Sequence, residues 1–252
     1  MKNVRAKKHL GQHFLNDEQI ALNITNLLND KTQNVVEIGP GMGVLTQFLV
    51  KKDFTTEVVE IDTESVFYLR LNYPQLADKI TEGNFLQLNL KEKYPYNFSL
   101  IGNFPYNISS QILFKTLENK DQISEVIGMF QKEVAERVAC KEGKKRGILS
   151  VFLQAFYDIE YCFTVNEDVF TPPPKVKSGV IKLVRNSRKE LPCDEKKFKQ
   201  VVKAGFNQRR KTLRNALKPF TLKDESELQD LLHLRAEQLS VDDFIKLTNH
   251  VG

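Results

Sequence analysis

Short apolar runs alternate with helix-like segments along the first two thirds of the chain. The runs are rich in Val, Ile and Phe, and most of the early segments between them carry apolar residues at helical spacing. This alternation predicts an α/β domain in which helices cover both faces of a mostly parallel sheet. The predicted strands are residues 34–39, 57–61, 79–83, 98–103, 126–130, 159–165 and 177–184.

The last two runs differ from the others because no helix-length segment separates them. Only residues 166–176 join them, a loop that contains Phe170 and three consecutive prolines. We therefore expect the last strand to be antiparallel and to form a hairpin with the strand before it, at the edge of the sheet.

After residue 185 the pattern becomes purely helical. A polar connector at residues 186–197 precedes an apolar helical face between Phe198 and Phe206, and Ser240-x-x-Asp243 has the spacing of a capping box. This change predicts a domain boundary near residue 187. The expected domains are a sheet domain at 1–187 and a small all-α domain at 188–252.

The chain begins with a basic segment. Residues 1–12 contain several Lys and Arg without an apolar core behind them, so we expect a mobile arm rather than a signal peptide or an anchor. Asp17 is then in place to cap a helix. No apolar run anywhere reaches the roughly 18 residues of a membrane span.

Positive charge is concentrated in one part of the chain. The formal net charge is only +5, but residues 196–218 contain nine Lys or Arg and no acidic residue. Such a cluster favours a polyanionic partner, because attraction to phosphates depends on local charge density. A solvated helical face is the alternative.

The three cysteines carry no sign of a metal or redox site. Cys140, Cys162 and Cys193 lack Cys-x-x-Cys spacing. We expect reduced thiols in a cytoplasmic protein, and no metal.

Glycines alternate between the first predicted strand and the helical segment that follows it. The sequence there is Glu37-Ile38-Gly39-Pro40-Gly41-Met42-Gly43. Gly39 and Gly41 let the backbone turn sharply and approach a nucleoside closely. Dinucleotide enzymes favour Gly-x-Gly-x-x-Gly, whereas the tighter spacing here is more like that of methyltransferases that bind S-adenosylmethionine.

Polar side chains stand at the ends of the next two predicted strands. Glu60 follows Gly39 by twenty-one residues, where a carboxylate can accept both ribose hydroxyls. An exposed strand-end acid is the alternative. Asn84 follows the third strand, and its amide can accept a hydrogen bond from an adenine amine or donate one to a ring nitrogen.

The fourth predicted strand leads into Asn103-Phe104-Pro105-Tyr106. The Asn103 side-chain oxygen and a backbone carbonyl beside the rigid proline can accept hydrogen bonds from an amine, and Tyr106 offers a stacking face. The stretch can therefore hold a flat, amine-bearing ring beside a cofactor. An ordinary turn after a strand explains the same residues.

Five motifs in the same order resemble the KsgA family, the small-subunit ribosomal RNA adenine dimethyltransferases. They are Gly-Gln-His-Phe-Leu at 11–15, the glycine motif at 37–43, Asn-Phe-Pro-Tyr-Asn-Ile-Ser at 103–109, Phe-Thr-Pro-Pro-Pro-Lys-Val at 170–176 and Gln-Arg-Arg-Lys-Thr-Leu-Arg-Asn at 208–215. The resemblance runs over about residues 5–220. It implies a Rossmann-like methyltransferase sheet.

The family's activity is implied by the same resemblance. It is the transfer of two methyl groups from S-adenosylmethionine to the N6 of each of two adjacent adenines in the 3′-terminal hairpin loop of 16S rRNA, on the assembling 30S subunit. Asn103 and the Pro105 carbonyl would shape the amine, and Tyr106 and Phe170 would close the two faces of the extruded adenine. Core packing is the alternative for Phe170. We expect a monomer.

The resemblance also assigns binding residues. The cofactor pocket would be lined by His13, Leu15, Gly39, Gly41, Glu60, Asn84 and Asn103. His13 stands where many members have Asn, and Asn84 where most have Asp. The RNA backbone would be held by Arg209, Arg210, Lys211 and Arg214.

Two other functions compete with this interpretation. The related erythromycin-resistance enzymes methylate an adenine of 23S rRNA, although the motif at 208–215 and the Tyr-Asn-Ile-Ser ending favour the small-subunit group. A ribosome-assembly factor or a transcription-factor relative would bind nucleic acid with methylation as a secondary property. An intact Asn103-Phe104-Pro105-Tyr106 argues against an inactive enzyme.

Overall fold

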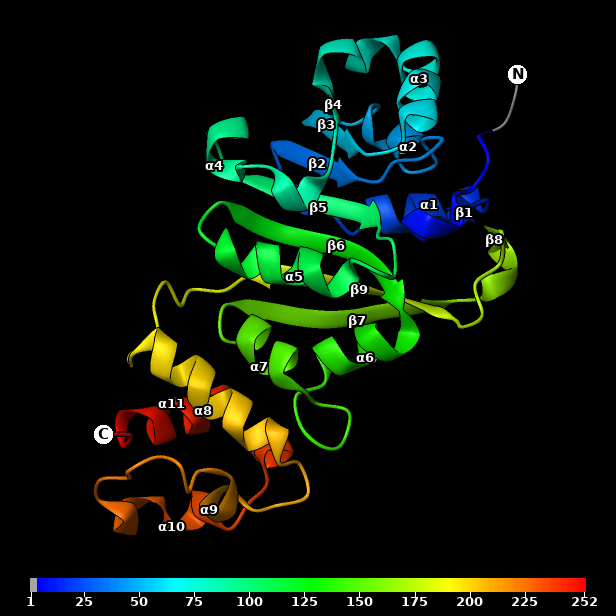
Figure 1. Ribbon diagram of the computed structural model, residues 1–252. Coiled ribbons are helices and arrows are strands. Elements are labelled where there is room, and N and C mark those ends of the chain that lie inside the picture. Colours follow the sequence, from blue (N-terminus) through cyan, green and yellow to red (C-terminus); the bar gives the residue numbers. More distant parts are fainter. Residues whose placement is uncertain (1–3) are drawn as a thin grey trace. The chain divides into compact units, whose positions relative to one another are not determined.

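The computed structural model describes residues 4–252, and the chain divides into two compact units (Figure 1). The sheet unit comprises the residues up to Ala135 together with Ile159–Arg185, and the helical unit comprises Glu136–Asp158 and Asn186–Gly252. The helical unit thus contains a segment, Glu136–Asp158, that lies inside the domain expected at 1–187.

A seven-stranded sheet is the centre of the fold. Its strand order is β4-β3-β2-β5-β6-β9-β7, so the chain runs outward from β2 in one direction and then crosses to β5 and continues in the other. Ligands bind at the carboxyl ends of the strands where such a reversal occurs. The strands are β2 (Asn34–Ile38), β3 (Thr55–Glu60), β4 (Ile80–Glu82), β5 (Phe98–Asn103), β6 (Ile123–Gln131), β7 (Tyr157–Val165) and β9 (Ser178–Arg185).

Strand directions confirm the predicted fold class. The ladders of β2 with β3, β2 with β5, β3 with β4 and β5 with β6 are all parallel, whereas β9 runs antiparallel to β6. The last strand is therefore antiparallel, as expected. It lies between β6 and β7, so the edge position belongs to β7.

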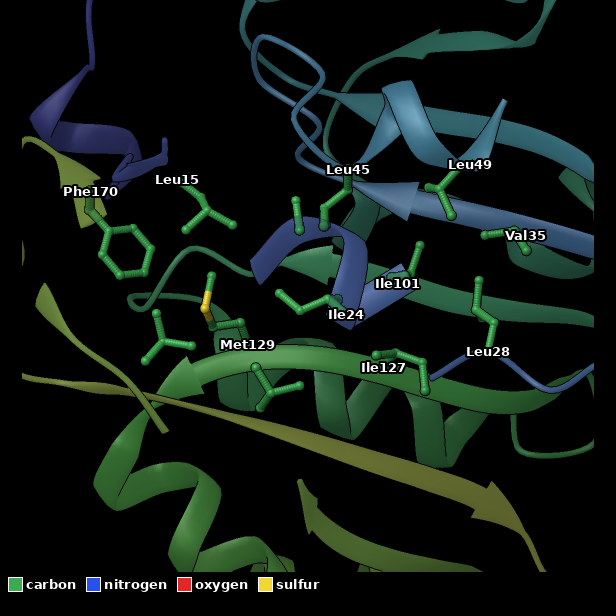
Figure 2. Close-up of a cluster of buried hydrophobic side chains, with 13 residues drawn as sticks. Leu15, Ile24, Leu28, Val35, Leu45, Leu49, Ile101, Ile127, Met129 and Phe170 are labelled. Atoms are coloured by element: carbon green, nitrogen blue, oxygen red, sulfur yellow. The ribbon is translucent and has the colours of Figure 1, made fainter. Parts of the chain in front are cut away.

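The sheet is buried on both faces. Val35, Ile101 and Ile127 belong to one apolar cluster together with side chains of α1 and α2 (Figure 2). Their sequence neighbours Val36 and Leu100 point to the opposite face and are equally buried. Burial of both faces explains why parallel strands appear in the sequence as continuous apolar runs.

Helices in the sheet unit follow the strands with clear start signals. Asp17 caps α1 by accepting from Ile20 N at 2.9 Å, and Asp62 caps α3 by accepting from Glu64 N at 3.3 Å. The Asp17 cap was expected from the sequence. The helices are α1 (Glu18–Thr25), α2 (Thr46–Leu49), α3 (Thr63–Asn72), α4 (Leu90–Lys93), α5 (Ser109–Glu118) and, reaching into the other unit, α6 (Lys132–Ala139).

A second, two-stranded sheet was missed by the sequence analysis. β1 (Phe14–Leu15) pairs antiparallel with β8 (Phe170–Thr171). Within the described residues, the arm that was expected to be mobile contains a 3-10 turn, Lys8–Leu10, which precedes β1. Its residues 1–3 lie outside the described chain.

The helical unit is built on two longer amphipathic helices. α8 buries Phe198, Val201, Val202 and Phe206 as predicted. α11 begins with the expected capping box, in which Ser240 Oγ accepts from Asp243 N at 3.1 Å and Asp243 accepts from Ser240 N at 2.8 Å. The helices are α7 (Ile148–Gln154), α8 (Glu195–Asn207), α9 (Leu213–Ala216), α10 (Gln229–Leu232) and α11 (Val241–Asn249).

None of the helices in the described chain is long and apolar enough to cross a membrane. Among residues 4–252, no group of three or more His, Cys, Asp or Glu side chains is arranged to hold a metal ion.

Candidate active site

A pocket of about 140 Å³ lies at the carboxyl edge of the large sheet, where β2, β3, β4 and β5 end. The N-terminal arm forms one of its walls, from His9 to Phe14. Eight of the residues predicted for the site line it together: His13, Gly39, Gly41, Glu60, Asn84, Asn103, Pro105 and Tyr106.

The glycine loop after β2 adopts a backbone that other residues rarely take. Gly39 and Gly41 have φ of +65° and +56°, in the left-handed region. A Cβ on Gly41 would meet the Phe14 ring at 2.7 Å, whereas a Cβ on Gly39 would meet only Pro105, at 3.9 Å. The backbone of Gly39 therefore faces open pocket space, which a side chain would fill.

Glu60 is 3% exposed and ties the glycine loop to the end of β3. One carboxylate oxygen accepts from Gly41 N at 3.0 Å, and the other accepts from Ile61 N at 2.8 Å and Asp62 N at 2.9 Å. Burial raises the pKa of Glu60, and these three amides oppose the rise. The sequence predicted Glu60 as a ribose acceptor; its bonds within the protein also fix the loop.

A second buried carboxyl in the same motif was not singled out by the sequence analysis. Glu37 is 1% exposed and accepts a hydrogen bond from Thr46 Oγ1 at 2.6 Å. Burial raises its pKa to about 8, with a further contribution from nearby Glu60. Glu37 is therefore largely protonated at neutral pH. The signal in the sequence was an acid inside an otherwise apolar strand.

Asn84 is held by its own turn. Its Oδ1 accepts from Leu86 N at 3.0 Å and caps the 3-10 turn Phe85–Gln87. With the oxygen engaged, the amide NH2 is the group best placed to serve a ligand, so the geometry favours donation to a ring nitrogen over acceptance from an amine.

Asn103 is oriented by the N-terminal arm. Its Nδ2 donates to the His13 carbonyl at 2.8 Å, which fixes the amide plane. No bond within the described chain occupies the side-chain oxygen, so the acceptor predicted from the sequence is available. The Pro105 carbonyl accepts from Ile108 N at 3.1 Å and retains a second lone pair.

The Tyr106 side chain is held at its hydroxyl and at its ring. Its hydroxyl forms a 2.6 Å hydrogen bond with Ser178 Oγ, and its ring lies 5.5 Å from the His13 ring at an angle of 32°. His13 is in turn bonded through Nδ1 to the Pro172 carbonyl at 2.7 Å. Burial raises the pKa of Tyr106, so the hydroxyl stays neutral and is no base at neutral pH.

The structure places two predicted site residues in the core. Leu15 and Phe170 face each other across the β1–β8 pair. They are 4% and 3% exposed within the apolar cluster of Figure 2, and neither lines the pocket. The role of Phe170 against an adenine face stays a prediction.

The N-terminal arm is attached to Asp62, two residues beyond the end of β3. Lys7 forms an ion pair with Asp62 and a second with Glu64 at 3.2 Å, and Gln12 Nε2 lies 3.4 Å from Asp62. Burial acts to raise the pKa of Asp62, but bonds from Lys7, Ser65 and Gln12 outweigh it and the pKa is lowered. Asp62 therefore remains charged and retains the arm.

The four basic residues predicted to bind RNA lie in the helical unit and are not equivalent. Arg209 donates to the carbonyls of Lys144 at 2.6 Å and Arg146 at 2.9 Å. Arg214 pairs with Glu225 at 3.2 Å and donates to Gln229 at 2.8 Å. Arg210 and Lys211 are exposed and make no side-chain hydrogen bond or ion pair within the described residues.

Comparison with known proteins gives full-length matches. A family model described as "Ribosomal RNA adenine dimethylase" matches residues 3–251. A Cytophaga hutchinsonii protein named ribosomal RNA small subunit methyltransferase A is 61% identical over 253 residues, 99% of this chain and 98% of the relative. A Flavobacterium johnsoniae protein of the same name is 59% identical, over 100% of this chain and 97% of the relative.

Two solved structures share the fold. A dimethyladenosine transferase from Plasmodium falciparum has a TM-score of 0.78 at 24% identity, over 93% of this chain and 96% of that one. The 23S rRNA methyltransferase ErmE has a TM-score of 0.73 at 22% identity, over 94% of this chain and 99% of that one. At these identities the likeness concerns the fold alone.

Proposed function

The chain belongs to the ribosomal RNA adenine dimethylase family, and from this membership we propose its reaction. It transfers methyl groups from S-adenosylmethionine to the N6-amino groups of two adjacent adenosines in the 3′-terminal hairpin loop of 16S rRNA, on the assembling 30S subunit in the cytoplasm. The product is N6,N6-dimethyladenosine. The observation that carries the proposal is Asn103, whose amide nitrogen is bonded to the His13 carbonyl while its oxygen bonds to no described residue, in the same pocket as the glycine loop.

The pocket residues fit the cofactor. The Gly39 backbone would lie against it, because a Cβ there would occupy the pocket. Glu60 has lone pairs left for the ribose hydroxyls, and the Asn84 NH2 would reach the adenine ring of the cofactor. When bound, S-adenosylmethionine supplies an electrophilic methyl group.

The chemical difficulty lies in the acceptor nitrogen. The N6 lone pair of adenine is delocalised into the ring, so the amine is a poor nucleophile. Hydrogen bonds from its two hydrogens to the Asn103 side-chain oxygen and the Pro105 carbonyl would favour a pyramidal nitrogen with its lone pair exposed. This is catalysis by positioning and electrostatics rather than by a strong base. Tyr106, whose pKa is raised by burial, supplies a neutral stacking face.

The helical part would hold the RNA. We propose that residues 188–252 form an RNA-binding domain attached to a methyltransferase domain at 1–187, in a monomer. Arg210 and Lys211 are exposed and form no ion pair with any of residues 4–252, so their charges are accessible for contacts with phosphates. Such contacts position the RNA without specifying its sequence.

Methyl transfer to unmethylated subunits tests the proposal. Small and large ribosomal subunits from a strain that lacks the modification would be incubated with the protein and a labelled methyl donor, and the label would be mapped by mass spectrometry. We expect two adjacent dimethylated adenosines in the 3′-terminal hairpin of the small-subunit RNA. Label on large-subunit RNA would favour the 23S enzyme type, and no label would favour an assembly factor. Either result would overturn the proposal.

A further inference from the structure

The hydroxyl of Tyr106 is held by a residue far away in the sequence. Ser178 lies 72 positions further along the chain, and its Oγ is 2.6 Å from the Tyr106 hydroxyl. This is at the short end for a hydrogen bond between hydroxyls. Ser178 is fully buried, with 0% exposure, so water does not compete for the bond.

The backbone of Ser178 is fixed by the large sheet. It is the first residue of β9, and it faces Gln131, the last residue of β6, in the antiparallel ladder. The strand β6 also pairs with β5, which ends at Asn103. The Ser178 hydroxyl thus stands at a position set by the same sheet that carries Asn103.

A second contact restrains the ring of Tyr106. The His13 ring packs against the tyrosine ring, and the His13 carbonyl receives the amide of Asn103. One tyrosine ring is therefore restrained at its hydroxyl by β9 and at its face by the residue that orients Asn103. A ring already fixed in this way loses little conformational freedom when a base stacks on it.

We propose that Ser178 is a positioning residue for methyl transfer, which sets the plane of the Tyr106 ring and through it the placement of the target adenine. The proposal rests on the function proposed above and adds a residue to it. Ser178 does not line the pocket, so its effect reaches the substrate through Tyr106. The hydrogen bond between them can be removed by substituting either residue.

The test is a double-mutant cycle on this bond. Ser178→Ala and Tyr106→Phe each remove one hydroxyl. Tyr106→Phe keeps the stacking ring, and it tests the bond even if Ser178→Ala fails to fold. We expect each single variant to lower the single-turnover rate at saturating RNA by about tenfold, the upper end for one hydrogen bond. The double variant should be no slower than the slower single variant, and the affinity for S-adenosylmethionine should be unchanged.

Ser150→Ala provides the matched control. Ser150 is equally buried and its hydroxyl donates to the Arg137 carbonyl, in the helical unit. The variant should lose stability without changing the saturating rate. The proposal is overturned if Ser178→Ala and Tyr106→Phe keep the wild-type rate, or if their losses multiply in the double variant. A wild-type protein without methyl transfer would instead refute the proposed function, and this inference with it.

Discussion

The carboxyl edge of the sheet and the basic stretch at residues 209–214 place their polar side chains in opposite situations. In the pocket, Glu60 bonds to three backbone amides, Asn103 to the arm and Tyr106 to β9. In the basic stretch, Arg210 and Lys211 project without partners in the described chain.

The difference follows from what each region must do. Chemistry at a reacting atom needs groups that are held in place before the substrate arrives. The side chains of the pocket are therefore fixed by hydrogen bonds to other parts of the protein. Attraction to RNA phosphates acts over many ångströms and needs only accessible charge. Arg209 and Arg214 depart from this division, because their guanidinium groups hold main-chain and side-chain oxygens of the helical unit.

The buried Glu37 should give the largest effect, on stability rather than on activity. Its pKa changes from 4.5 to about 8 on folding, so the folded chain binds the extra proton between these values. The free energy of unfolding should therefore fall as pH rises from about 5 to about 8, by up to about 5 kcal/mol. Glu37→Gln should remove this slope in urea unfolding, and the exposed Glu92→Gln should retain it. A wild-type curve that is flat over this range would contradict the burial argument.

Glu60→Ala should weaken cofactor binding on the order of 100-fold, because three backbone amides lose their acceptor and the glycine loop is released. Calorimetric titration with S-adenosylmethionine measures this loss. Glu82→Ala is the control, since Glu82 is exposed and bonds only to Thr63 among the described residues. If Glu60→Ala bound the cofactor as tightly as the wild type, the loop would not depend on this carboxylate.

Arg210→Ala combined with Lys211→Ala should lower RNA affinity about tenfold at low salt and reduce the slope of log K against log[salt] by between about 1.4 and 1.8. Filter binding over a series of salt concentrations measures both. Cofactor affinity should not change. The double variant Lys91→Ala and Lys93→Ala, in α4 of the sheet unit, removes the same charge and should leave the slope intact. An unchanged slope in the first variant would contradict the RNA surface.

Arg209→Ala should have the smallest effect on RNA binding, but it should measurably lower the stability of the fold. Its guanidinium donates to two carbonyls of the loop before α7, so its loss should cost about 1 kcal/mol and lower the midpoint of thermal unfolding by a few degrees. Arg210→Ala should leave the midpoint unchanged. Equal midpoints for the two variants would mean that both arginines are available to RNA.

Most of the sheet and its helix caps could be predicted from the sequence because their signals are local. Apolar runs defined β2, β5 and β6, Asp17 was in the right place for a cap, and Ser240-x-x-Asp243 had the spacing of a capping box. The pairing of β1 with β8 left no such signal, because each strand has only two residues and is too short to show a hydrophobic pattern in the sequence. Burial of Phe170 is a consequence of that pairing.

Contacts between distant segments explain what was missed in the site. The motif around Asn103 indicated the acceptors and the stacking ring, but the bonds that orient Asn103 and Tyr106 come from His13 and Ser178, 90 and 72 residues away from their partners. Charge counting found the basic stretch but did not separate Arg209, which donates to the carbonyls of Lys144 and Arg146, from Arg210, which has no side-chain partner among residues 4–252. Sequence spacing alone does not report such pairings.

The most direct test of this division of labour compares two variants in one measurement, the single-turnover rate of methyl transfer at saturating RNA and cofactor. Asn103→Ala should be slower than the wild type on the order of 100-fold, because the reacting amine loses an acceptor that saturation does not replace. The Arg210→Ala and Lys211→Ala double variant should reach the wild-type rate once RNA saturates it. Full rate in Asn103→Ala, or a persistent defect in the double variant, would contradict the account.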